Sequence, residues 1–334
     1  MNIAVIGLGY WGPNLLRNLY ESQTTEKLIA CDLDETKLQR IKLKYPTVEI
    51  ESDYQKLLRR DDIDAAIVAT PVSLHFPIAH ALLEAGKHVF VEKPMTQNSQ
   101  EAEKLVETAE KNNRVLMVGH TFEYSPPVLK IKELIDSKEL GDVYYISMSR
   151  VNLGLHQKDV SVIWDLAPHD FSMLFYWLNQ QPKRISAMGK DCVQKNIPDV
   201  AFINIEFPDG CIANMQVSWL APSKLRRTAI VGNKKMLVYD DTENIEKVKI
   251  YDKGVEYKDP ETFGEYQLSY RSGDIISPYI QNFEPLRREM NHFIECCQNG
   301  KKPISDGRSG LRVIKALEAA EKSLRNNSQV VEIA

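Results

Sequence analysis

The chain opens with an apolar run and three closely spaced glycines, and this feature most constrains its fold. Residues 3–6 are Ile-Ala-Val-Ile, as expected of a parallel strand that is buried on both faces. The glycines follow as G-x-G-x-x-G at Gly7, Gly9 and Gly12, and Pro13 stands in the first turn of the helix expected next. This spacing allows a tight turn, close approach of a pyrophosphate to the backbone, and close helix–strand packing. The stretch therefore predicts a dinucleotide-binding strand–turn–helix.

An acidic residue at the end of the second expected strand fits the same site. Residues 27–32 form this strand, and Asp32 lies 32 − 12 = 20 residues after Gly12. A carboxylate at this distance binds the adenosine ribose hydroxyls and repels a 2′-phosphate. Residues 33–35 are Leu, Asp and Glu, and they include no arginine that would offset the repulsion. We therefore expect NAD rather than NADP, with a purely structural strand–turn–helix as the alternative.

Length and composition fit a globular protein of two domains. The 334 residues are 43% hydrophobic and 26% charged, and the net charge of −4 gives no bulk attraction to nucleic acid or to an anionic membrane. No apolar run reaches the ~18 residues of a membrane span, and the first strand begins too early to leave room for a signal peptide. The five cysteines form no C-x-x-C and no zinc-ligand spacing with histidine. We expect reduced thiols, no metal, and a cytoplasmic protein.

The alternation of strands and helices changes near residue 120. Residues 1–120 alternate strand and helix, which is typical of a doubly wound parallel sheet. Residues 121–334 are richer in strands joined by turn residues such as Pro208-Asp209-Gly210, which favour antiparallel pairing. Residues 241–282 lack periodicity and predict short strands with an extended loop. The expected fold is α/β: an N-terminal doubly wound Rossmann domain (1–120) and a C-terminal α+β domain (121–334) with a mainly antiparallel open sheet. Two helices are expected to close the chain, at 284–299 and 309–326.

Five motifs spread along the chain carry a resemblance to a known family. They are the glycines of residues 7–12, Ala69-Thr70-Pro71 with His75, Glu92-Lys93-Pro94, Asp165 with His169, and an ending from Ser305-Asp306-Gly307 to Leu317-Glu318-Ala319-Ala320. On these motifs the whole chain resembles the glucose–fructose oxidoreductase, inositol dehydrogenase and rhizopine-catabolism (Gfo/Idh/MocA) family. Within that family, residues 9–14 and 164–170 are similar to the sugar and nucleotide-sugar 3-dehydrogenases.

The resemblance implies an NAD-dependent oxidoreductase with its active site in the cleft between the two domains. The cofactor residues that it implies are Gly7, Gly9, Tyr10, Trp11, Gly12, Asp32, Thr70, Pro71, His75, Glu92 and Lys93. The substrate residues are Lys93, Tyr124, Asn152, His156, Asp165 and His169. Packing or loop roles for Tyr124, Asn152 and His156, and helix capping by His75, remain open alternatives. The family often has arginine before the position of Tyr124, where this chain has Glu123, so the substrate of a characterised member does not transfer directly.

Three residues are candidates for the chemistry. Lys93 lies just beyond the carboxyl end of a strand, where a cation can hold a sugar hydroxyl and favour its alkoxide-like form. Asp165 and His169 are four residues apart, so on a helix they share a face, and the carboxylate can orient an imidazole base. Pro168 is unfavourable inside a helix, and we therefore expect the helix to begin near Asp165 as N-cap. A surface Lys93, a capping Asp165 and a packed His169 remain the alternative.

The expected reaction is oxidation of the 3-hydroxyl of a sugar, with His169 as base, Lys93 stabilising the oxyanion and Asp165 orienting the base. The favoured substrate is a UDP-N-acetyl sugar such as UDP-N-acetylglucosamine or its uronic acid. Its diphosphate could be met by Arg150, Lys158 and residues 224–227. The alternatives are a dehydrogenase or keto-reductase for a free sugar, inositol or dTDP-keto-sugar, and a non-catalytic NAD(P)-binding regulator. The resemblance also implies a homodimer or homotetramer that uses the open sheet.

Overall fold

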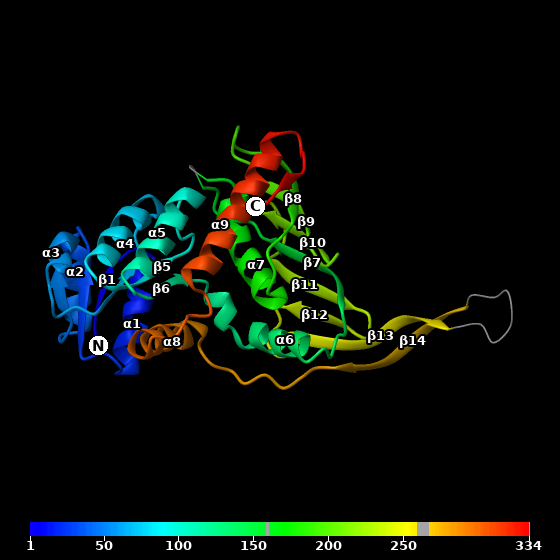
Figure 1. Cartoon of the computed structure of the whole chain (residues 1–334), viewed down its shortest axis with the longest axis horizontal. Helices are drawn as coiled ribbons and strands as arrows, with labels where there is room; N and C mark the ends of the chain where they lie inside the picture. Colours follow the sequence, from blue (N-terminus) through cyan, green and yellow to red (C-terminus); the bar gives the residue numbers. More distant parts are fainter. Residues whose placement is uncertain (158–159, 259–266, 334) are drawn as a thin grey trace. The chain divides into compact units, whose positions relative to one another are not determined.

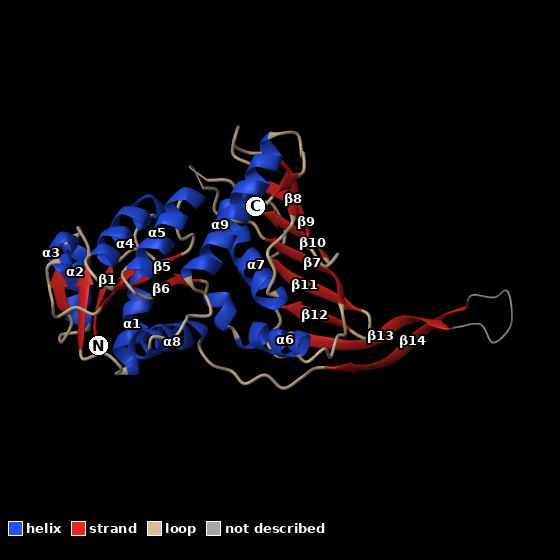
Figure 2. Ribbon diagram, in the orientation of Figure 1, coloured by secondary structure: helices blue, strands red, loops and turns tan. Residues whose placement is uncertain are grey.

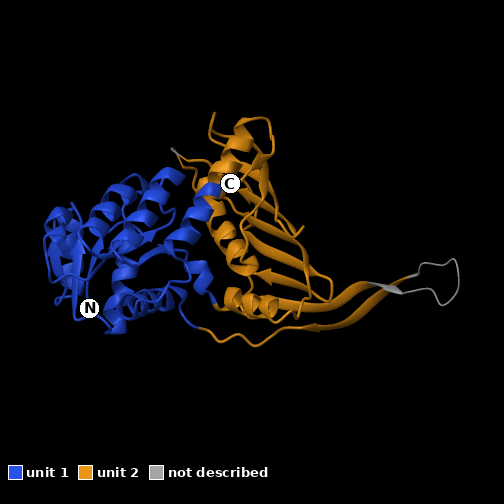
Figure 3. Cartoon of the chain, viewed as in Figure 1, with its two compact units in different colours: residues 1–125, 283–315 blue, residues 126–282, 316–334 orange. Residues whose placement is uncertain are grey.

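The computed structural model describes residues 1–157, 160–258 and 267–333, and the chain divides into two compact units (Figure 3). Unit 1 contains residues 1–125 and 283–315, and unit 2 contains residues 126–282 and 316–334. Unit 1 is therefore built from two segments of the chain, and the second of them comes from the region that the sequence assigns to the C-terminal domain. None of the described helices is both long and apolar enough to cross a membrane.

Unit 1 has the predicted doubly wound fold, with a parallel six-stranded sheet in the order β3-β2-β1-β4-β5-β6. Its strands are β1 (Asn2–Ile6), β2 (Lys27–Cys31), β3 (Glu49–Glu51), β4 (Ala65–Val68), β5 (His88–Glu92) and β6 (Leu116–Gly119). Its helices are α1 (Gly12–Ser22), α2 (Glu35–Lys44), α3 (Tyr54–Leu58), η1 (Val72–Leu74), α4 (His75–Glu84), α5 (Ser99–Lys111), η2 (Thr121–Tyr124), α8 (Pro285–Asn299) and the first part of α9 (Gly307–Arg325). The strand order reverses at β1 and β4, where an open α/β sheet binds its ligand.

Apolar packing explains why the late helix α8 belongs to unit 1. The central strands are buried on both faces, and Phe90 in β5 is fully buried. Phe293 of α8 packs edge-on against this ring at a centroid distance of 5.8 Å, and Met290 lies in the same hydrophobic core. Burial of one such side chain stabilises the fold by about 1.5–3 kcal/mol. Helix α8 thus completes the core of the dinucleotide-type domain.

Unit 2 is built on a mainly antiparallel sheet, as predicted, in the order β14-β13-β12-β11-β7-β10-β9-β8-β15 (Figure 1). Its described strands are β7 (Val143–Val151), β8 (Arg184–Lys190), β9 (Val200–Glu206), β10 (Ile212–Ser218), β11 (Leu225–Gly232), β12 (Met236–Asp240), β13 (Val248–Lys258), β14 (Gln267–Ile276) and β15 (Val331–Glu332). Strands β10 and β7 pair in parallel. The region 241–282, expected to be short strands and an extended loop, instead contains two long strands, β13 and β14, which pair antiparallel.

The helices of unit 2 are α6 (Pro126–Asp136), α7 (Val162–Leu178) and the end of α9, and Figure 2 shows them on one face of the sheet. The strands alternate buried and exposed side chains, as expected when only one face is covered. The opposite face carries the exposed side chains.

Helix α7 begins earlier than predicted, which corrects the expectation that Asp165 is its N-cap. Ser161 occupies the N-cap position, Asp165 lies within the first turns, and Pro168 lies inside the helix. An interior proline costs about 3 kcal/mol because it removes one helical hydrogen bond. Several fully buried side chains of the helix, including Ile163, Phe171 and Leu174, offset this cost.

Candidate active site

The carboxyl ends of the central strands of unit 1 line a pocket of about 900 Å³. Its lining includes every predicted cofactor residue except Gly12: Gly7, Gly9, Tyr10, Trp11, Asp32, Thr70, Pro71, His75, Glu92 and Lys93. Lys37 and residues 52–55 also line the pocket, and no sequence motif pointed to them. The strand order places Asp32 after β2, the glycine loop after β1, and Glu92 at the end of β5. The pocket therefore extends across the edge of the sheet.

The glycines of the loop have different structural roles. Gly7 has φ +92°, and a Cβ atom there would lie 2.7 Å from the carbonyl oxygen of Ala69. A Cβ atom on Gly12 would lie 1.9 Å from the carbonyl oxygen of Gly7, whereas Gly9 has no atom within 4 Å of such a position. The N-cap residue Trp11 makes no side-chain capping bond. The open face at Gly9 and the uncapped start of α1 fit a pyrophosphate.

The Asp32 carboxylate is fixed by the backbone around it. Oδ2 accepts a hydrogen bond from Leu8 N at 2.6 Å, and Oδ1 accepts one from Asp34 N at 2.9 Å. The Lys37 ammonium lies 3.4 Å from Oδ2. Lys37 was not predicted from the sequence, although its place in the first turn of the helix after Asp32 was the available signal. The carboxylate and its neighbouring lysine fit the adenosine ribose end of NAD.

His75 connects the chain segments that follow β4 and β5. The side chain is buried, with Nδ1 at 2.9 Å from the carbonyl oxygen of Pro94 and Nε2 at 2.8 Å from that of Thr70. Burial lowers the pKa of His75, and a neutral ring can donate to only one of these two carbonyl oxygens. Both ring nitrogens face the backbone, so the imidazole positions the loop that carries Lys93.

In unit 2, Trp219 brings together three of the predicted substrate residues. The Trp219 indole N–H donates to Asp165 Oδ2 at 2.8 Å, and the His156 ring lies 5.3 Å from the indole, centroid to centroid. Gly154 permits this packing, since a Cβ atom there would lie 2.9 Å from Trp219 and 3.4 Å from Asn152 Nδ2. No role for Trp219 was predicted from the sequence, because its position at the end of a strand did not reveal these contacts.

His169 lies one helical turn after Asp165 on α7, and both side chains are half-buried. The carbonyl oxygen of His169 accepts a hydrogen bond from Ser172 Oγ at 3.0 Å. His156 Nε2 lies 3.9 Å from Oδ2 of Asp199, a fully buried carboxylate that also accepts a hydrogen bond from Val193 N at 2.8 Å. In the described part of the chain, no group of three or more His, Cys, Asp or Glu side chains could hold a metal ion.

Two predicted ligand contacts are wrong because the side chains are engaged elsewhere. Tyr124 is fully buried, and its hydroxyl lies 3.2 Å from Ser305 Oγ, so it cannot reach a substrate. Arg150 is buried in a bidentate ion pair with Asp170, with Nη2 at 2.8 Å and Nε at 3.0 Å, so it is not available to a diphosphate. Lys158, the other candidate nearby in the chain, lies outside the described residues.

The chain is similar to known proteins throughout its length. Residues 1–120 match the family model described as "Oxidoreductase family, NAD-binding Rossmann fold", and residues 128–238 match the "GFO/IDH/MocA C-terminal domain". Myo-inositol 2-dehydrogenase of Thermotoga maritima is 24% identical over 99% of this chain and 98% of its own length. UDP-N-acetylglucosamine 3-dehydrogenase of Acidithiobacillus ferrooxidans is 27% identical over 58% of this chain and 60% of its own.

Solved structures share the fold. The structure of the A. ferrooxidans enzyme has a TM-score of 0.81 at 22% identity, covering 98% of this chain and 99% of that one. A protein of gentamicin A biosynthesis, solved in complex with NAD, has a TM-score of 0.82 at 21% identity, covering 100% and 96%. Together with the two family models, these findings show that the chain belongs to the Gfo/Idh/MocA family, as an NAD-dependent oxidoreductase that acts on CH–OH groups.

Proposed function

We propose that the protein oxidises the C3 hydroxyl of a UDP-linked N-acetyl sugar, such as UDP-N-acetylglucosamine or its uronic acid, with NAD as the acceptor. The observation that best supports the oxidation is the position of Lys93, which lines the same dinucleotide pocket as Asp32 and the glycine loop. The nucleotide sugar is supported by the similarity to UDP-N-acetylglucosamine 3-dehydrogenase. A free polyol is the second candidate, because an inositol dehydrogenase matches almost the whole chain.

The proposed mechanism assigns one task to each of three side chains. Bound NAD supplies the hydride acceptor at C4 of its nicotinamide ring. His169 takes the hydroxyl proton, and Lys93 stabilises the negative charge that develops on the oxygen. Asp165, fixed by the Trp219 N–H, places a carboxylate on the helix face that carries His169. The carboxylate would favour the protonated imidazole that forms as the hydroxyl gives up its proton.

The diphosphate of such a substrate needs cations or backbone N–H groups. Since Arg150 is engaged with Asp170, we assign this role to the exposed side chain of Lys224, just before β11. Arg226 pairs with Asp241 at 3.3 Å. Arg227 pairs in register with Ser149 on the uncovered face of the sheet, away from α7, and is therefore the matched control for Lys224.

The test is turnover of a panel of UDP- and dTDP-sugars, myo-inositol and free glucose, followed by the absorbance of reduced nicotinamide. Lys93→Ala and His169→Ala should each lower turnover by about a hundredfold or more, with NAD binding by His169→Ala nearly unchanged. A Lys224→Ala variant should raise KM for the nucleotide sugar only, and Arg227→Ala should leave this KM unchanged. Turnover of inositol without binding of any nucleotide sugar would contradict the substrate, and NAD binding without turnover of any compound would favour a regulator.

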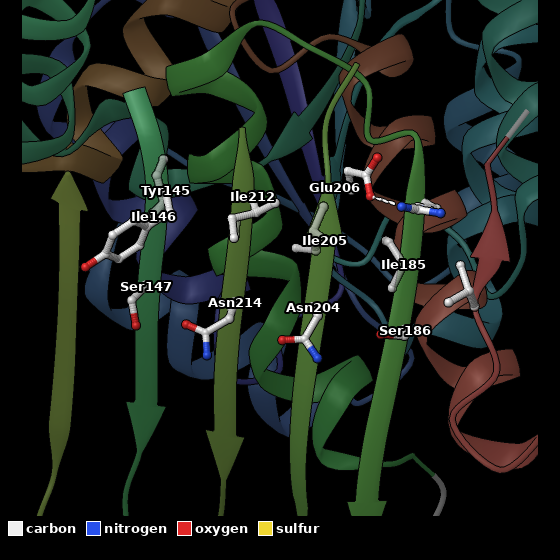
Figure 4. A pocket seen from close by; sticks show the side chains of 13 residues that line it. Tyr145, Ile146, Ser147, Ile185, Ser186, Asn204, Ile205, Glu206, Ile212 and Asn214 are labelled. Atoms are coloured by element: carbon white, nitrogen blue, oxygen red, sulfur yellow. Dashed lines mark hydrogen bonds and ion pairs between the residues drawn. The ribbon is translucent and has the colours of Figure 1, made fainter. Parts of the chain in front are cut away.

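We also propose that the protein is a homodimer or homotetramer through the uncovered face of the unit 2 sheet. Figure 4 shows part of this face, where Tyr145 and Ile212 stand beside the amides of Asn204 and Asn214. Phe202 is likewise 45% exposed, and such clustered apolar side chains are typical of interaction surfaces. Light scattering after gel filtration should show a dimer or larger for the wild type and a smaller species for Ile212→Lys. A monomeric wild type would contradict the assembly.

A further inference from the structure

We propose that Glu92 is a redox-linked proton site, which is ionised beside the oxidised nicotinamide and binds a proton more tightly beside the reduced one. The inference rests on the proposed function only in placing the nicotinamide near Lys93. It concerns proton binding by this chain, and it holds for any alcohol substrate.

The placement follows from the order of the strands. Asp32 after β2 marks the adenosine end of the pocket, and the glycine loop after β1 marks the pyrophosphate. The rest of an extended dinucleotide then lies over the ends of β4 and β5, where Glu92 and Lys93 line the pocket. The nicotinamide half is therefore the part of NAD that meets Glu92.

The Glu92 carboxyl group is nearly enclosed. The residue is 7% exposed, and Oε2 accepts a hydrogen bond from Lys93 N at 3.2 Å. Glu92 pairs with Gly119 of β6, and a Cβ atom at position 119 would lie 3.1 Å from Oε2. The absence of a side chain at position 119 thus lets the carboxyl group lie against the β6 backbone. A carboxylate in such a position gains little solvation from water.

Unit 1 contains other buried titratable groups, of which Glu289 interacts electrostatically with Glu92. His120 after β6 is 1% exposed, and burial together with the charge of Lys93 lowers its pKa to about 3, so the ring stays neutral. Glu289 of α8 is fully buried, accepts a hydrogen bond from Thr121 Oγ1 at 2.7 Å, and has a pKa raised well above the usual range by burial. Burial likewise raises the pKa of Glu123 in η2 and lowers the pKa of His75 in α4.

Two of these neighbours carry buried polar atoms that lack a hydrogen-bond partner. Both ring nitrogens of His120 and Oε1 of Glu289 have no hydrogen-bond partner among the described residues. Buried polar atoms of this kind are usually satisfied by ordered water. Lys93 is the cation that acts on Glu92, and burial disfavours a charge on both His120 and Glu289.

The direction of the proton exchange follows from the charges. Burial raises the pKa of Glu92 to about 7, against the opposing effect of Lys93. An added positive charge lowers the pKa of a carboxyl group, and the oxidised nicotinamide ring is positive whereas the reduced ring is neutral. Glu92 therefore gives up a proton when NAD⁺ binds. It takes up a proton in the step in which the substrate loses one.

The step balances in atoms and electrons. The substrate C–H bond breaks, and its electron pair leaves with the hydrogen as a hydride to the bound acceptor. The substrate O–H bond also breaks, and the proton passes to His169 and then to solvent, while Glu92 takes up about half a proton from solvent at pH 7 to form a carboxyl O–H bond. The substrate is oxidised by two electrons, and at pH 7 the enzyme-bound conversion releases about half a proton net, falling towards none at lower pH.

Calorimetric titration with NAD⁺ and NADH, in buffers of different ionisation enthalpy, measures these protons without any sugar. At pH 7 the wild type should release about half a proton on binding NAD⁺ and none on binding NADH, since half of Glu92 is protonated in the free protein. From pH 6 to pH 8 the Kd of NAD⁺ should fall by about tenfold, because the ionised form binds it better. Equal proton release with both cofactors, or none with either, would overturn the proposal.

Variants identify the source of the proton. Glu92→Gln should bind NAD⁺ without proton release, whereas Glu289→Gln, the matched buried carboxyl-to-amide change, should keep it. Lys93→Met should shift the release to higher pH, and its loss at every pH would assign the proton to the lysine instead. The wild-type comparison of NAD⁺ with NADH decides the question even where a variant does not fold. Because no substrate is used, failure of this test is separate from failure of the proposed substrate.

Discussion

Cofactor choice should depend on Asp32 and Lys37 together. In the wild type the carboxylate is fixed by Leu8 N at 2.6 Å and Asp34 N at 2.9 Å, ready to accept bonds from ribose hydroxyls. Asp32→Ser removes the charged acceptor. Hydrogen bonds to charged groups contribute about 1.5–3 kcal/mol, so NAD should bind about ten- to hundredfold more weakly. The same change removes the repulsion of a 2′-phosphate.

Lys37 decides how far NADP binding improves. Its ammonium lies 3.4 Å from Asp32, and its side chain is 39% exposed. An exposed ion pair contributes about 0.2–1 kcal/mol, so losing it has little effect on stability, and the freed lysine can meet the phosphate. NADP affinity should rise by about tenfold or more in Asp32→Ser, and Lys37→Ala in that background should abolish the gain. Lys37→Ala alone should change NAD affinity by no more than about fivefold.

The assay is calorimetric measurement of the dissociation constants of NAD and NADP. Both are measured for the wild type, the two single variants and the double variant. Thermal unfolding is the control, because Asp32 also holds the glycine loop through Leu8 N. An unchanged NAD-to-NADP ratio in Asp32→Ser would refute the ribose contact. NADP binding that persists in the double variant would refute the role of Lys37.

Three further predictions concern the loop and unit 2. Gly12→Ala should lower both the thermal unfolding midpoint and the NAD affinity, because its Cβ would lie 1.9 Å from the Gly7 oxygen. Gly9→Ala should fold normally and lose only NAD affinity, and equal unfolding midpoints of the two variants would contradict this. Arg150→Met should lower the free energy of unfolding in urea by about 3–5 kcal/mol by leaving Asp170 buried and unpaired, with partial recovery in Arg150→Met/Asp170→Asn. Trp219→Phe should lower kcat about fivefold, from loss of about 1 kcal/mol of hydrogen bonding to Asp165, with NAD affinity unchanged; unchanged kcat would show that Asp165 needs no such support.

Local patterns predicted the order of elements in unit 1 well. The apolar run of β1 and the glycines after it are visible in the sequence. The helix N-caps Asp34, Asp53 and Asn98 were not predicted, although each capping side chain accepts a backbone N–H of its helix. Periodicity does not show what an apolar helix face packs against, so the place of α8 in unit 1 was not predictable. Pro168 misled the prediction of the α7 start, because burial of the helix outweighs its cost.

The site was predictable where spacing determines geometry. The glycines and Asp32 lie at fixed distances along one strand–turn–helix, and they line the pocket or pack beneath it. Lys37, Trp219 and the groups around Glu92 were missed, because their contacts join residues whose relation only the folded chain reveals. The ligand contacts predicted for Tyr124 and Arg150 were wrong for the converse reason, because both polar groups bind partners inside the protein.

Oxidation at C3 of a nucleotide sugar is tested most directly by following the hydrogen itself. UDP-N-acetylglucosamine and its uronic acid, each carrying deuterium at C3, are incubated with NAD and the protein, and the nicotinamide product is isolated for mass spectrometry. The account predicts that deuterium appears in the reduced nicotinamide and that the sugar product has lost its C3 label, with both signals nearly absent for Lys93→Ala. Reduced nicotinamide that carries no deuterium, or formation of reduced nicotinamide only with free inositol or glucose, would contradict it.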